Sequence, residues 1–351
     1  MTEITRRGAS SLLLAALAAP AVLSRTSFAA DAPRVRIQGS GNTLTNIPEL
    51  YAHTFGLFEK NGISAENLPG IYNAGGILQA IVQGTAEIAS TGGSAIIQAA
   101  QQGRRVKTIG IGMQGFEIKV SLTKPGLEKV AKLGVSATAP INDRVNALRG
   151  MRLAAPATGS SSDTLFRYSM KRLGMDANRD TVVQPMPDMP SVVAAARTGA
   201  VDGIIGLTAT GLGRAEAEGT ATRFISFEVE DPTLSIYPAI ALVVSDEYLA
   251  KNGDTLRRVL TAYHQAKQAI RRGLTEDELA AVKKKFFPDM PDAAWTGGLK
   301  LTTPNLIGPI TPSRAQFDAL FVVHNATAEV PASVTYEQCF DSRIAEAVEK
   351  A

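Results

Sequence analysis

One pattern of residues occurs twice in this chain and constrains its fold more than any other feature. Residues 80–89 and 195–204 share the spacing A-x-x-x-G-x-x-[D/E], with Gly84 and Gly199 at equivalent positions. In each copy an apolar helix ends at a glycine that can adopt positive φ, and a strand follows. The spacing is also a common helix-to-strand turn, but both copies occupy the same place in a series of strands and helices. The pattern therefore predicts two similar α/β units.

The segments around the first copy alternate between strand and helix patterns. The segment VRIQGSGN alternates in polarity and stops in glycines, as a strand entering a loop does. After it we expect a helix over 47–62, a strand over 63–70, a helix over 75–85, a strand over 86–91, a helix over 94–103 and a strand over 106–114. Such alternation is typical of a parallel sheet covered by helices.

Two strand-like segments predict how the chain divides into domains. Residues 116–126 and 235–245 flank the second copy of the pattern, and we interpret them as crossovers between two domains. We therefore expect a first lobe formed by residues 33–123 and 235–351, and a second lobe formed by residues 124–234. The chain is mostly helical in pattern from Asp254 onward, and we expect those helices to pack on the first lobe.

The first 29 residues have the pattern of a secretory signal peptide. Arg6 and Arg7 precede an apolar run that is interrupted by Pro20 and is too short to span a bilayer, for which about 20 apolar residues are needed. The arginine pair is compatible with twin-arginine export, and ordinary Sec export stays open. Cleavage after Ala29 would release a soluble periplasmic protein. The lone cysteine, Cys339, is far from any lipid-attachment position, so we expect no lipid anchor.

Charge and cysteine content exclude several classes of protein. Residues 1–29 hold three of the 36 basic and one of the 33 acidic residues, so the mature chain has a net charge of +1. A nearly neutral chain without a basic stripe gives no basis for nucleic-acid binding. A single cysteine cannot form an intramolecular disulfide, so ordinary hydrophobic cores must hold the mature chain, which is long enough for two domains. We expect a monomer.

Three consecutive serines, Ser160–Ser162, raise the question of catalysis. The nucleophile elbow of an α/β hydrolase requires G-x-S-x-G, and here Asp163 stands where the second glycine belongs. The three histidines, His53, His264 and His324, lie on helical patterns with apolar neighbours, as packing or surface histidines do. The chain contains no C-x-x-C and no G-K-[S/T] motif, and no pair of histidines or carboxylates has metal-ligand spacing. The segment GSGNTLT resembles the opening of G-x-G-x-x-G but has Leu44 where the third glycine belongs. We therefore predict no catalytic residue, no metal site and no cofactor.

The serines are better interpreted as groups that hold a ligand or cap a helix. Ser160 can cap the following helix while Asp163 reaches back, which is a capping box. The free N–H groups and the dipole of that helix terminus favour an anion such as a carboxylate, sulfonate or phosphate. Asp163 opposes this preference, so a zwitterionic ligand with an amine is also compatible. Capping alone stays as the alternative.

Taken in order, these segments resemble the extracytoplasmic solute-binding proteins of ABC importers, in the nitrate, sulfonate and taurine branch. The resemblance extends from Val35 to Val348 and includes the segments VRIQGSGN, GLFEKNGI, GGILQAIVQGTAEIASTG, LRGMRLAAPATGSSSD, LGMDANRDTVV and AARTGAVDGI. It implies an α/β periplasmic-binding-protein type II fold, with two α/β lobes joined by two crossing hinge strands. It also implies that a ligand is clamped as the lobes close, like a Venus flytrap, and that a membrane permease is the partner.

The resemblance further implies which residues line the cleft. They are Ser40, Asn42, Thr43, Gly93, Ser94, Gln114, Ser160, Ser161, Ser162, Asp188, Thr208 and Tyr237. This set contains no arginine or lysine. Either backbone N–H groups and hydroxyls hold an anion, or the ligand is neutral, aromatic or zwitterionic.

Two alternatives to transport stay open. The same superfamily includes proteins that make or carry a thiamine pyrimidine precursor, a chemistry that would require a cleft motif with histidine and cysteine. Cys339, near the C-terminus, is a poor candidate for it. A periplasmic sensor subunit that presents its bound state to a histidine kinase would use the same fold.

Overall fold

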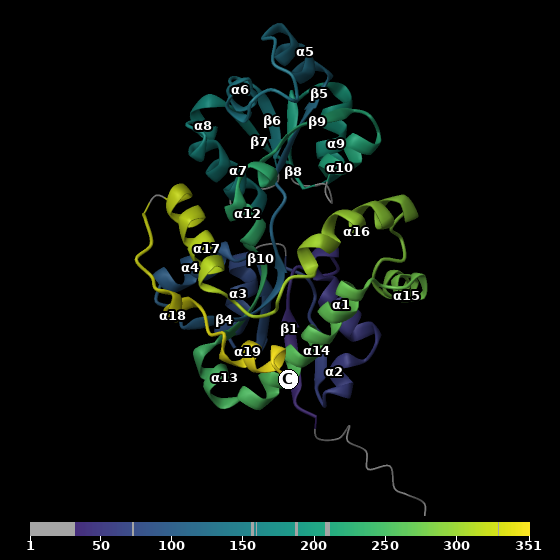
Figure 1. Cartoon of the computed structure of the whole chain (residues 1–351), viewed down its shortest axis with the longest axis vertical. Helices are drawn as coiled ribbons and strands as arrows, with labels where there is room; N and C mark the ends of the chain where they lie inside the picture. The colour runs from purple at the N-terminus through teal and green to yellow at the C-terminus, as the bar shows by residue number, and fades with distance from the viewer. Residues whose placement is uncertain are drawn as a thin grey trace, which may run out of the picture. The chain divides into compact units, whose positions relative to one another are not determined.

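The computed structural model describes residues 32–71, 74–155, 158, 160–186, 189–207, 211–328 and 330–351. The expected signal peptide lies outside the described residues, as do Asp188 and Thr208. The described strands form two five-stranded sheets, with helices packed around both (Figure 1). This arrangement confirms the expected α/β fold class.

Both sheets are built on the same plan. In the first sheet, with order β2-β1-β3-β10-β4, β1 is parallel to β2 and β3, and β10 is antiparallel to β3 and β4. In the second sheet, with order β7-β6-β8-β5-β9, β6 is parallel to β7 and β8, and β5 is antiparallel to β8 and β9. The strands are β1 Arg34–Gln38, β2 Ser64–Asn67, β3 Ile88–Thr91, β4 Val106–Gln114, β5 Lys119–Thr123, β6 Arg152–Ala155, β7 Val182–Pro185, β8 Gly203–Gly206, β9 Ala221–Ser226 and β10 Pro238–Ser245.

Helices that precede β4 or follow β10 accompany the first sheet. They are η1 Leu44–Asn46, α1 Ile47–Thr54, α2 Leu57–Lys60, α3 Ala74–Val82, α4 Ser94–Gln101, α13 Asp246–Lys251, α14 Gly253–Arg272, α15 Glu276–Phe286, α16 Asp292–Leu306, α17 Arg314–Thr327, α18 Tyr336–Cys339 and α19 Arg343–Glu349. The long helix α14 packs against α1, α2 and α19. The single helix expected over 47–62 is interrupted at Gly56, whose φ of +63° is left-handed and ends α1 before α2 begins.

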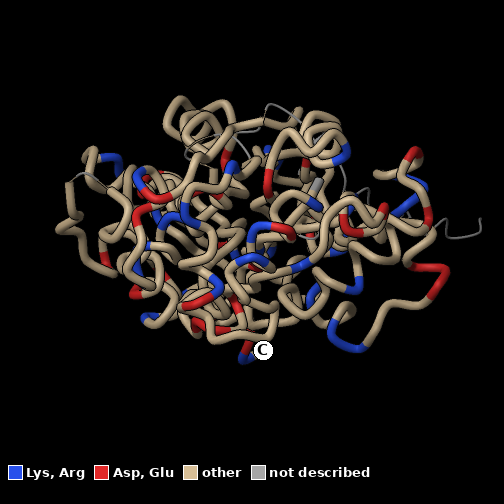
Figure 2. Tube along the Cα trace, turned by 90° about the horizontal axis from the view of Figure 1, so that it is seen from above, with Lys and Arg blue, Asp and Glu red and all other residues tan. Residues whose placement is uncertain are grey.

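Helices between β5 and β10 accompany the second sheet. They are α5 Lys124–Lys132, α6 Ile141–Asn146, α7 Ser161–Arg172, α8 Ala177–Asp180, α9 Met189–Thr198, α10 Gly211–Ala217, α11 Phe227–Glu230 and α12 Pro232–Ile236. Basic and acidic residues are interspersed along the trace of the chain (Figure 2).

The repeated pattern has the same structural role in both sheets. Gly84 and Gly199 adopt φ of +71° and +67°, as the pattern predicts. The acidic residue three positions later then binds the neighbouring parallel strand of its sheet. Glu87 accepts hydrogen bonds from the backbone N and the guanidinium of Arg36 in β1, and Asp202 does the same with Arg152 in β6. In both copies of the repeated pattern, the acidic residue therefore joins two neighbouring parallel strands.

The antiparallel strand of each sheet arrives from the other half of the chain. After β4 the chain crosses at residues 115–118 and enters the second sheet as β5. After β9 it returns through α11 and α12 and inserts β10 between β3 and β4. The strand-like pattern of residues 116–126 predicts that residues up to 123 belong to the first lobe, whereas β5 hydrogen-bonds to β8 and β9 in the second sheet. The crossover therefore precedes β5.

Candidate functional site

The end of one parallel strand of the first sheet lies beside the first residue of a helix of the second sheet. We call the loops after β1, β3, β6 and β8 the strand-end loops. A Cβ built on Gly92, directly after β3, would lie 3.0 Å from Ser161 Oγ at the start of α7, which follows β6. In open α/β sheets, ligands bind beside such strand ends and helix N-termini. The contact between Gly92 and Ser161 therefore marks the candidate site.

The three serines at the start of α7 have different environments. Ser160 is the N-cap, and its Oγ accepts a hydrogen bond of 3.3 Å from the Asp163 backbone N, so the predicted cap is present. Ser161 faces Gly92, and Ser162 is buried. The Asp163 carboxylate accepts a hydrogen bond of 2.8 Å from Arg167 Nε. Of the three serines, Ser161 therefore lies at the junction between the sheets.

The N-terminus of α4 contributes hydroxyl groups from the first sheet. Gly93 and Ser94 begin this helix, and the Tyr237 hydroxyl lies close to Ser94. Burial raises the pKa of Tyr237 far above its usual value. The Tyr237 hydroxyl and Thr91 Oγ1 are buried and have no hydrogen-bond partner among the described residues. Two buried hydroxyls therefore lie in this part of the first sheet, directly before β10 and at the end of β3.

The other predicted residues of the first lobe have protein partners. The backbone of Ser40 packs against Gly70, and the exposed Asn42 donates to the Phe286 carbonyl in α15. Thr43 shares a hydrogen bond with Thr45. Gln114 accepts from Gln316 Nε2 in α17 at 3.1 Å, and its side chain packs against Gly308. Asp188 and Thr208 were also predicted, and they lie outside the described residues.

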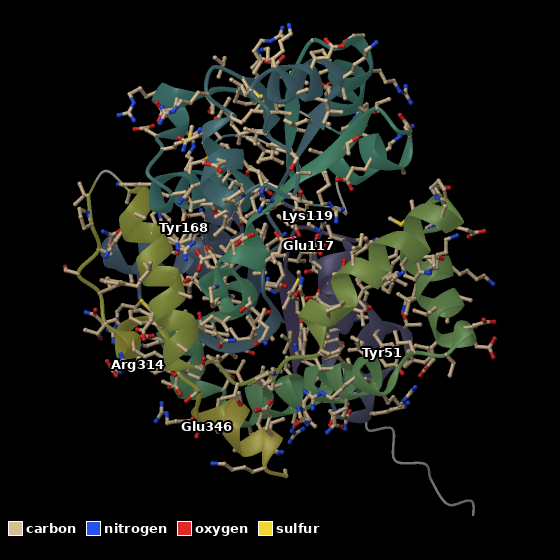
Figure 3. All side chains as sticks on the ribbon, turned by 45° about the horizontal axis from the view of Figure 1, so that its top comes forward. Tyr51, Glu117, Lys119, Tyr168, Arg314 and Glu346 are labelled. Atoms are coloured by element: carbon tan, nitrogen blue, oxygen red, sulfur yellow. The ribbon has the colours of Figure 1, made fainter. Side chains whose placement is uncertain are left out.

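The structure adds a buried lysine that the predicted residue set lacks. Lys119, the first residue of β5, is 3% exposed, and its cross-strand neighbours are the last residues of β8 and β9. Its Nζ lies 2.7 Å from Glu117 Oε2 and 3.5 Å from Glu228 Oε1 (Figure 3). Burial raises the pKa of Glu228. The sequence signal is a lysine inside the apolar run that forms β5.

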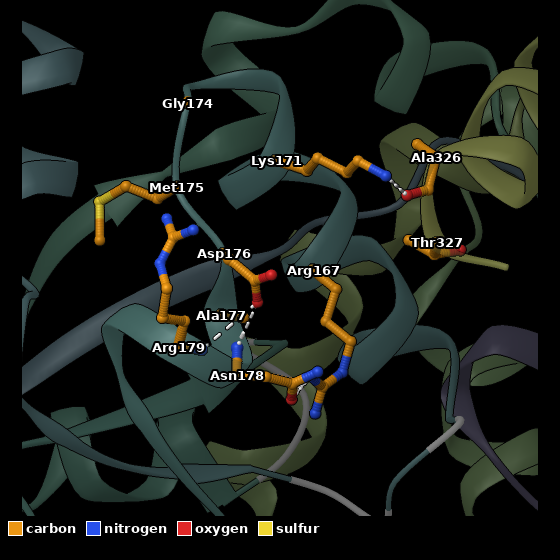
Figure 4. Close-up of a pocket in the computed structure, with 10 residues that line it drawn as sticks. All are labelled: Arg167, Lys171, Gly174, Met175, Asp176, Ala177, Asn178, Arg179, Ala326 and Thr327. Atoms are coloured by element: carbon orange, nitrogen blue, oxygen red, sulfur yellow. Dashed lines mark hydrogen bonds between the residues drawn. The ribbon is translucent and has the colours of Figure 1, made fainter. Parts of the chain in front are cut away.

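A pocket of 420 Å³ lies between α7, α8 and the C-terminal end of α17 (Figure 4). Arg167, Lys171 and Arg179 line it, and each already has a protein partner: Asp163 and Asn178 for Arg167, the Ala326 carbonyl for Lys171 and Asp180 for Arg179. The 2.9 Å bond from Lys171 Nζ to Ala326 connects a helix of the second sheet to α17 of the first. The pocket therefore lies where a helix of the second sheet contacts a helix of the first sheet.

A buried polar network lies behind the first strand-end loop. Tyr263 donates a 2.6 Å hydrogen bond to Glu49, and His53 Nε2 is 2.7 Å from Asn67 Oδ1. Burial raises the pKa of Glu49 to about 7, although hydrogen bonds from Tyr263, Ser90 and Asn67 act to lower it. The structure thus holds a carboxyl group that titrates near neutral pH.

This carboxyl group predicts a pH dependence of stability. The pKa of Glu49 rises from 4.5 in the unfolded chain to about 7 in the folded one, so its stabilising contribution is complete below pH 4.5 and is lost as the pH rises through 7. We expect the free energy of unfolding of the wild type, relative to a Glu49→Gln variant, to fall between pH 5 and pH 8. Urea unfolding at several pH values measures it. Parallel curves for the two proteins would contradict the assignment.

The cysteine and the three histidines, which are the side chains considered for catalysis here, are all at least partly buried. Burial raises the pKa of the Cys339 thiol to about 11, which disfavours the reactive thiolate. His264 contacts Gln268, and burial lowers the pKa values of His53, His264 and His324. In the described part of the chain, no group of three or more histidine, cysteine, aspartate or glutamate side chains could hold a metal ion. No described helix combines the length and apolarity that a membrane span requires.

Comparison with solved structures identifies the fold as that of type II periplasmic binding proteins. A protein from Bordetella bronchiseptica superposes with a TM-score of 0.72 at 17% identity, over 90% of this chain and 97% of its own. The aliphatic sulphonate binding protein SsuA from Escherichia coli gives 0.63 at 20% identity, over 87% and 90%. The nitrate-binding protein NrtA from Synechocystis gives 0.63 at 13% identity, over 91% and 89%. At these identities the similarity shows the fold alone.

At the level of sequence, one family model matches the chain. The family described as NMT1/THI5 like matches residues 44–272, which is more than half of the chain. No curated protein matches the chain in sequence.

Proposed function

Because the chain belongs to the NMT1/THI5-like family, we propose that it is the extracytoplasmic solute-binding component of an ABC importer. The mature protein, a periplasmic monomer, captures a small organic solute between its two lobes and delivers it to a membrane permease. By lobes we mean residues 33–114 with 238–351, and residues 119–226. The solute makes contacts with both lobes only when they are closed, so binding shifts the population toward the closed form.

The observation that carries this proposal is the approach of Ser161 to Gly92. The two residues belong to different sheets, and both lie where parallel strands end. A ligand at this junction reaches the N-terminus of α7, the N-terminus of α4 and the buried hydroxyls of Thr91 and Tyr237. The fold neighbours named for sulphonate and nitrate binding support the same reading.

Thermal shift and mass spectrometry test the proposal. The purified mature protein should gain thermal stability with one small solute from a panel of sulfonates, carboxylates, amino acids and aromatic acids. On unfolding, it should release that solute unchanged. A chemically altered product would favour an enzyme of the thiamine-pyrimidine type, although the buried thiol of Cys339 argues against that alternative. A signal from a co-expressed histidine kinase, without uptake, would favour a sensor subunit.

The three serines give a matched pair of variants. We expect Ser161→Ala to weaken solute binding at least tenfold, about 1.4 kcal/mol, with little effect on the melting temperature of the ligand-free protein. Ser160→Ala should instead destabilise the protein by about 1 kcal/mol, because it removes the N-cap. Calorimetric titration and thermal melts measure both quantities. If Ser161→Ala changed stability and affinity in proportion, the turn would be only a cap.

A further inference from the structure

A second pocket, of 290 Å³, lies within the first lobe between helices α1, α14, α15 and α16 (Figure 1). The large side chains that line it are apolar: Ile47, Ile270, Leu274, Leu279, Trp295 and Leu299. An apolar cavity of about 150 Å³ already holds benzene. This pocket therefore has room for one aromatic ring or one branched alkyl group with a substituent. None of the described residues that line it belongs to the predicted set of cleft residues.

The pocket is a consequence of the way α14 ends. Gly273 lines it and ends the helix with a φ of +88°, and a Cβ built there would meet no other described atom within 4 Å. On the facing wall, Leu299 and Thr303 of α16 are four residues apart and therefore lie on one face of that helix. The pocket thus lies between the residue that ends α14 and one face of α16.

The described lining contains one cation and no carboxylate. Lys300 of α16 is exposed, and it has no ion-pair or hydrogen-bond partner among the described residues. Glu278, directly before Leu279 of the lining, is already paired with Arg272. A carboxylate on an occupant would therefore complement the charge of the lining.

We propose that this pocket is a second ligand site, which binds a small carboxylic acid with an apolar body. The body, a single aromatic ring or a branched alkyl group, packs against Trp295 and Leu299, and the carboxylate pairs with Lys300 at the rim. The site is separate from the predicted cleft, so this inference goes beyond the proposed function and does not depend on it.

Fluorescence provides a direct test, because Trp295 is the only tryptophan of the chain and lines the pocket. The mature protein is titrated with 4-methylbenzoate, with the neutral 4-methylbenzamide and with the cationic 4-methylbenzylamine. We expect a saturable change in Trp295 emission with the acid, and about threefold or more weaker binding of the amide and the amine, as the loss of an exposed ion pair implies. No saturable change, or equal or tighter binding of the amide or the amine, would overturn the inference.

The same titration with the Ser161→Ala variant separates this site from the predicted cleft. The affinity for 4-methylbenzoate should equal that of the wild type, because Ser161 does not line the pocket. A tenfold loss would place the acid in the cleft instead and overturn the inference while supporting the proposed function. Failure of a solute to bind in the cleft would leave the Trp295 titration unaffected.

Variants of the lining complete the test. Lys300→Met removes the charge but keeps an apolar side chain, and it should weaken binding of the acid about threefold or more without affecting the amide. Lys284→Met, which removes an exposed lysine of α15 outside the described lining, is the matched control and should change neither. Equal effects of the two lysine variants on the acid would overturn the assignment of Lys300.

A larger side chain at Thr303 should close the pocket. Thr303→Phe is expected to weaken binding of 4-methylbenzoate by about tenfold or more, because the new ring occupies the apolar space of the ligand, whereas Thr303→Ser leaves that space open and should bind as the wild type does. Melting temperatures show whether each variant is folded. Wild-type affinity in folded Thr303→Phe protein would overturn the inference, and if this variant does not fold, Lys300→Met decides.

Discussion

An Asp202→Ala variant should lose about 3 kcal/mol of stability, because it removes one partner of a buried ionic cluster. Asp202 is fully buried and accepts hydrogen bonds from Lys129 Nζ at 2.7 Å, from the Arg152 backbone N at 2.9 Å and from the Arg152 guanidinium. Burial alone would raise the pKa of Asp202, but the bonds from Arg152 and Lys129 outweigh it and lower the pKa. Without the carboxylate, the parallel strands β6 and β8 keep the backbone hydrogen bond from Asp202 N to the Arg152 carbonyl but lose the side-chain bonds that connect them at this end.

Thermal unfolding with a matched control measures the loss. A change of this size lowers the melting temperature by roughly 4–5 °C for a chain of this length. Glu218→Ala is the control, because Glu218 is also a carboxylate of the second lobe with two arginine partners, Arg197 and Arg214, but lies nearer the surface. It should melt close to the wild type. Equal melting temperatures for the two variants would show that the Asp202 cluster has no special role.

A Gly92→Leu variant should bind solute at least a hundredfold more weakly, because the new side chain occupies the space in which Ser161 approaches. A Cβ at this position already lies 3.0 Å from Ser161 Oγ. The hundredfold loss corresponds to about 2.8 kcal/mol. Closure of the two lobes would cost this additional free energy because α7 would have to move away from the new side chain. The backbone itself permits the substitution, since Gly92 has no positive φ.

The stability of the ligand-free variant is the internal control. Apart from Ser161, the nearest atom to the new Cβ is the Ala239 carbonyl oxygen at 3.8 Å, so the ligand-free protein should melt near the wild-type temperature. Gly297→Leu, at an exposed glycine inside α16 with open space around it, should leave the affinity unchanged and should not lower the melting temperature, because leucine favours a helix more than glycine does. Normal affinity in Gly92→Leu would show that the ligand does not bind where Ser161 meets Gly92.

The features that the sequence predicts are local in the chain. Gly84 and Gly199 end their helices with positive φ because no other residue does so at low cost, and the following strands begin as expected. Ser160 caps α7 for the same kind of reason, since a hydroxyl three residues before an N–H group is a local arrangement. Local rules of this kind are sufficient to predict the α/β class and the two similar units.

The features that the sequence does not predict depend on residues far apart in the chain. The strand pattern of residues 119–123 is the same whichever sheet receives it, so the pairing of β5 with β8 and β9 cannot be derived from it. Lys119 resembles an outward-facing polar residue of a strand, and its partner Glu228 lies on α11. The same limit applies to the arginine partners of the repeated acidic residues, and to Tyr237, whose unpaired hydroxyl depends on burial by tertiary packing.

The exchange of antiparallel strands determines the order in which the two halves can fold. All five strands of the second sheet lie within residues 119–226, so a growing polypeptide can complete that sheet as soon as this segment has been made. The first sheet begins earlier in the chain but stays open between β3 and β4 until residues 238–245 arrive to pair with both. Contacts over such long loops form slowly. The half that is synthesised first is therefore the half that is finished last, and it folds around a partner that is already formed.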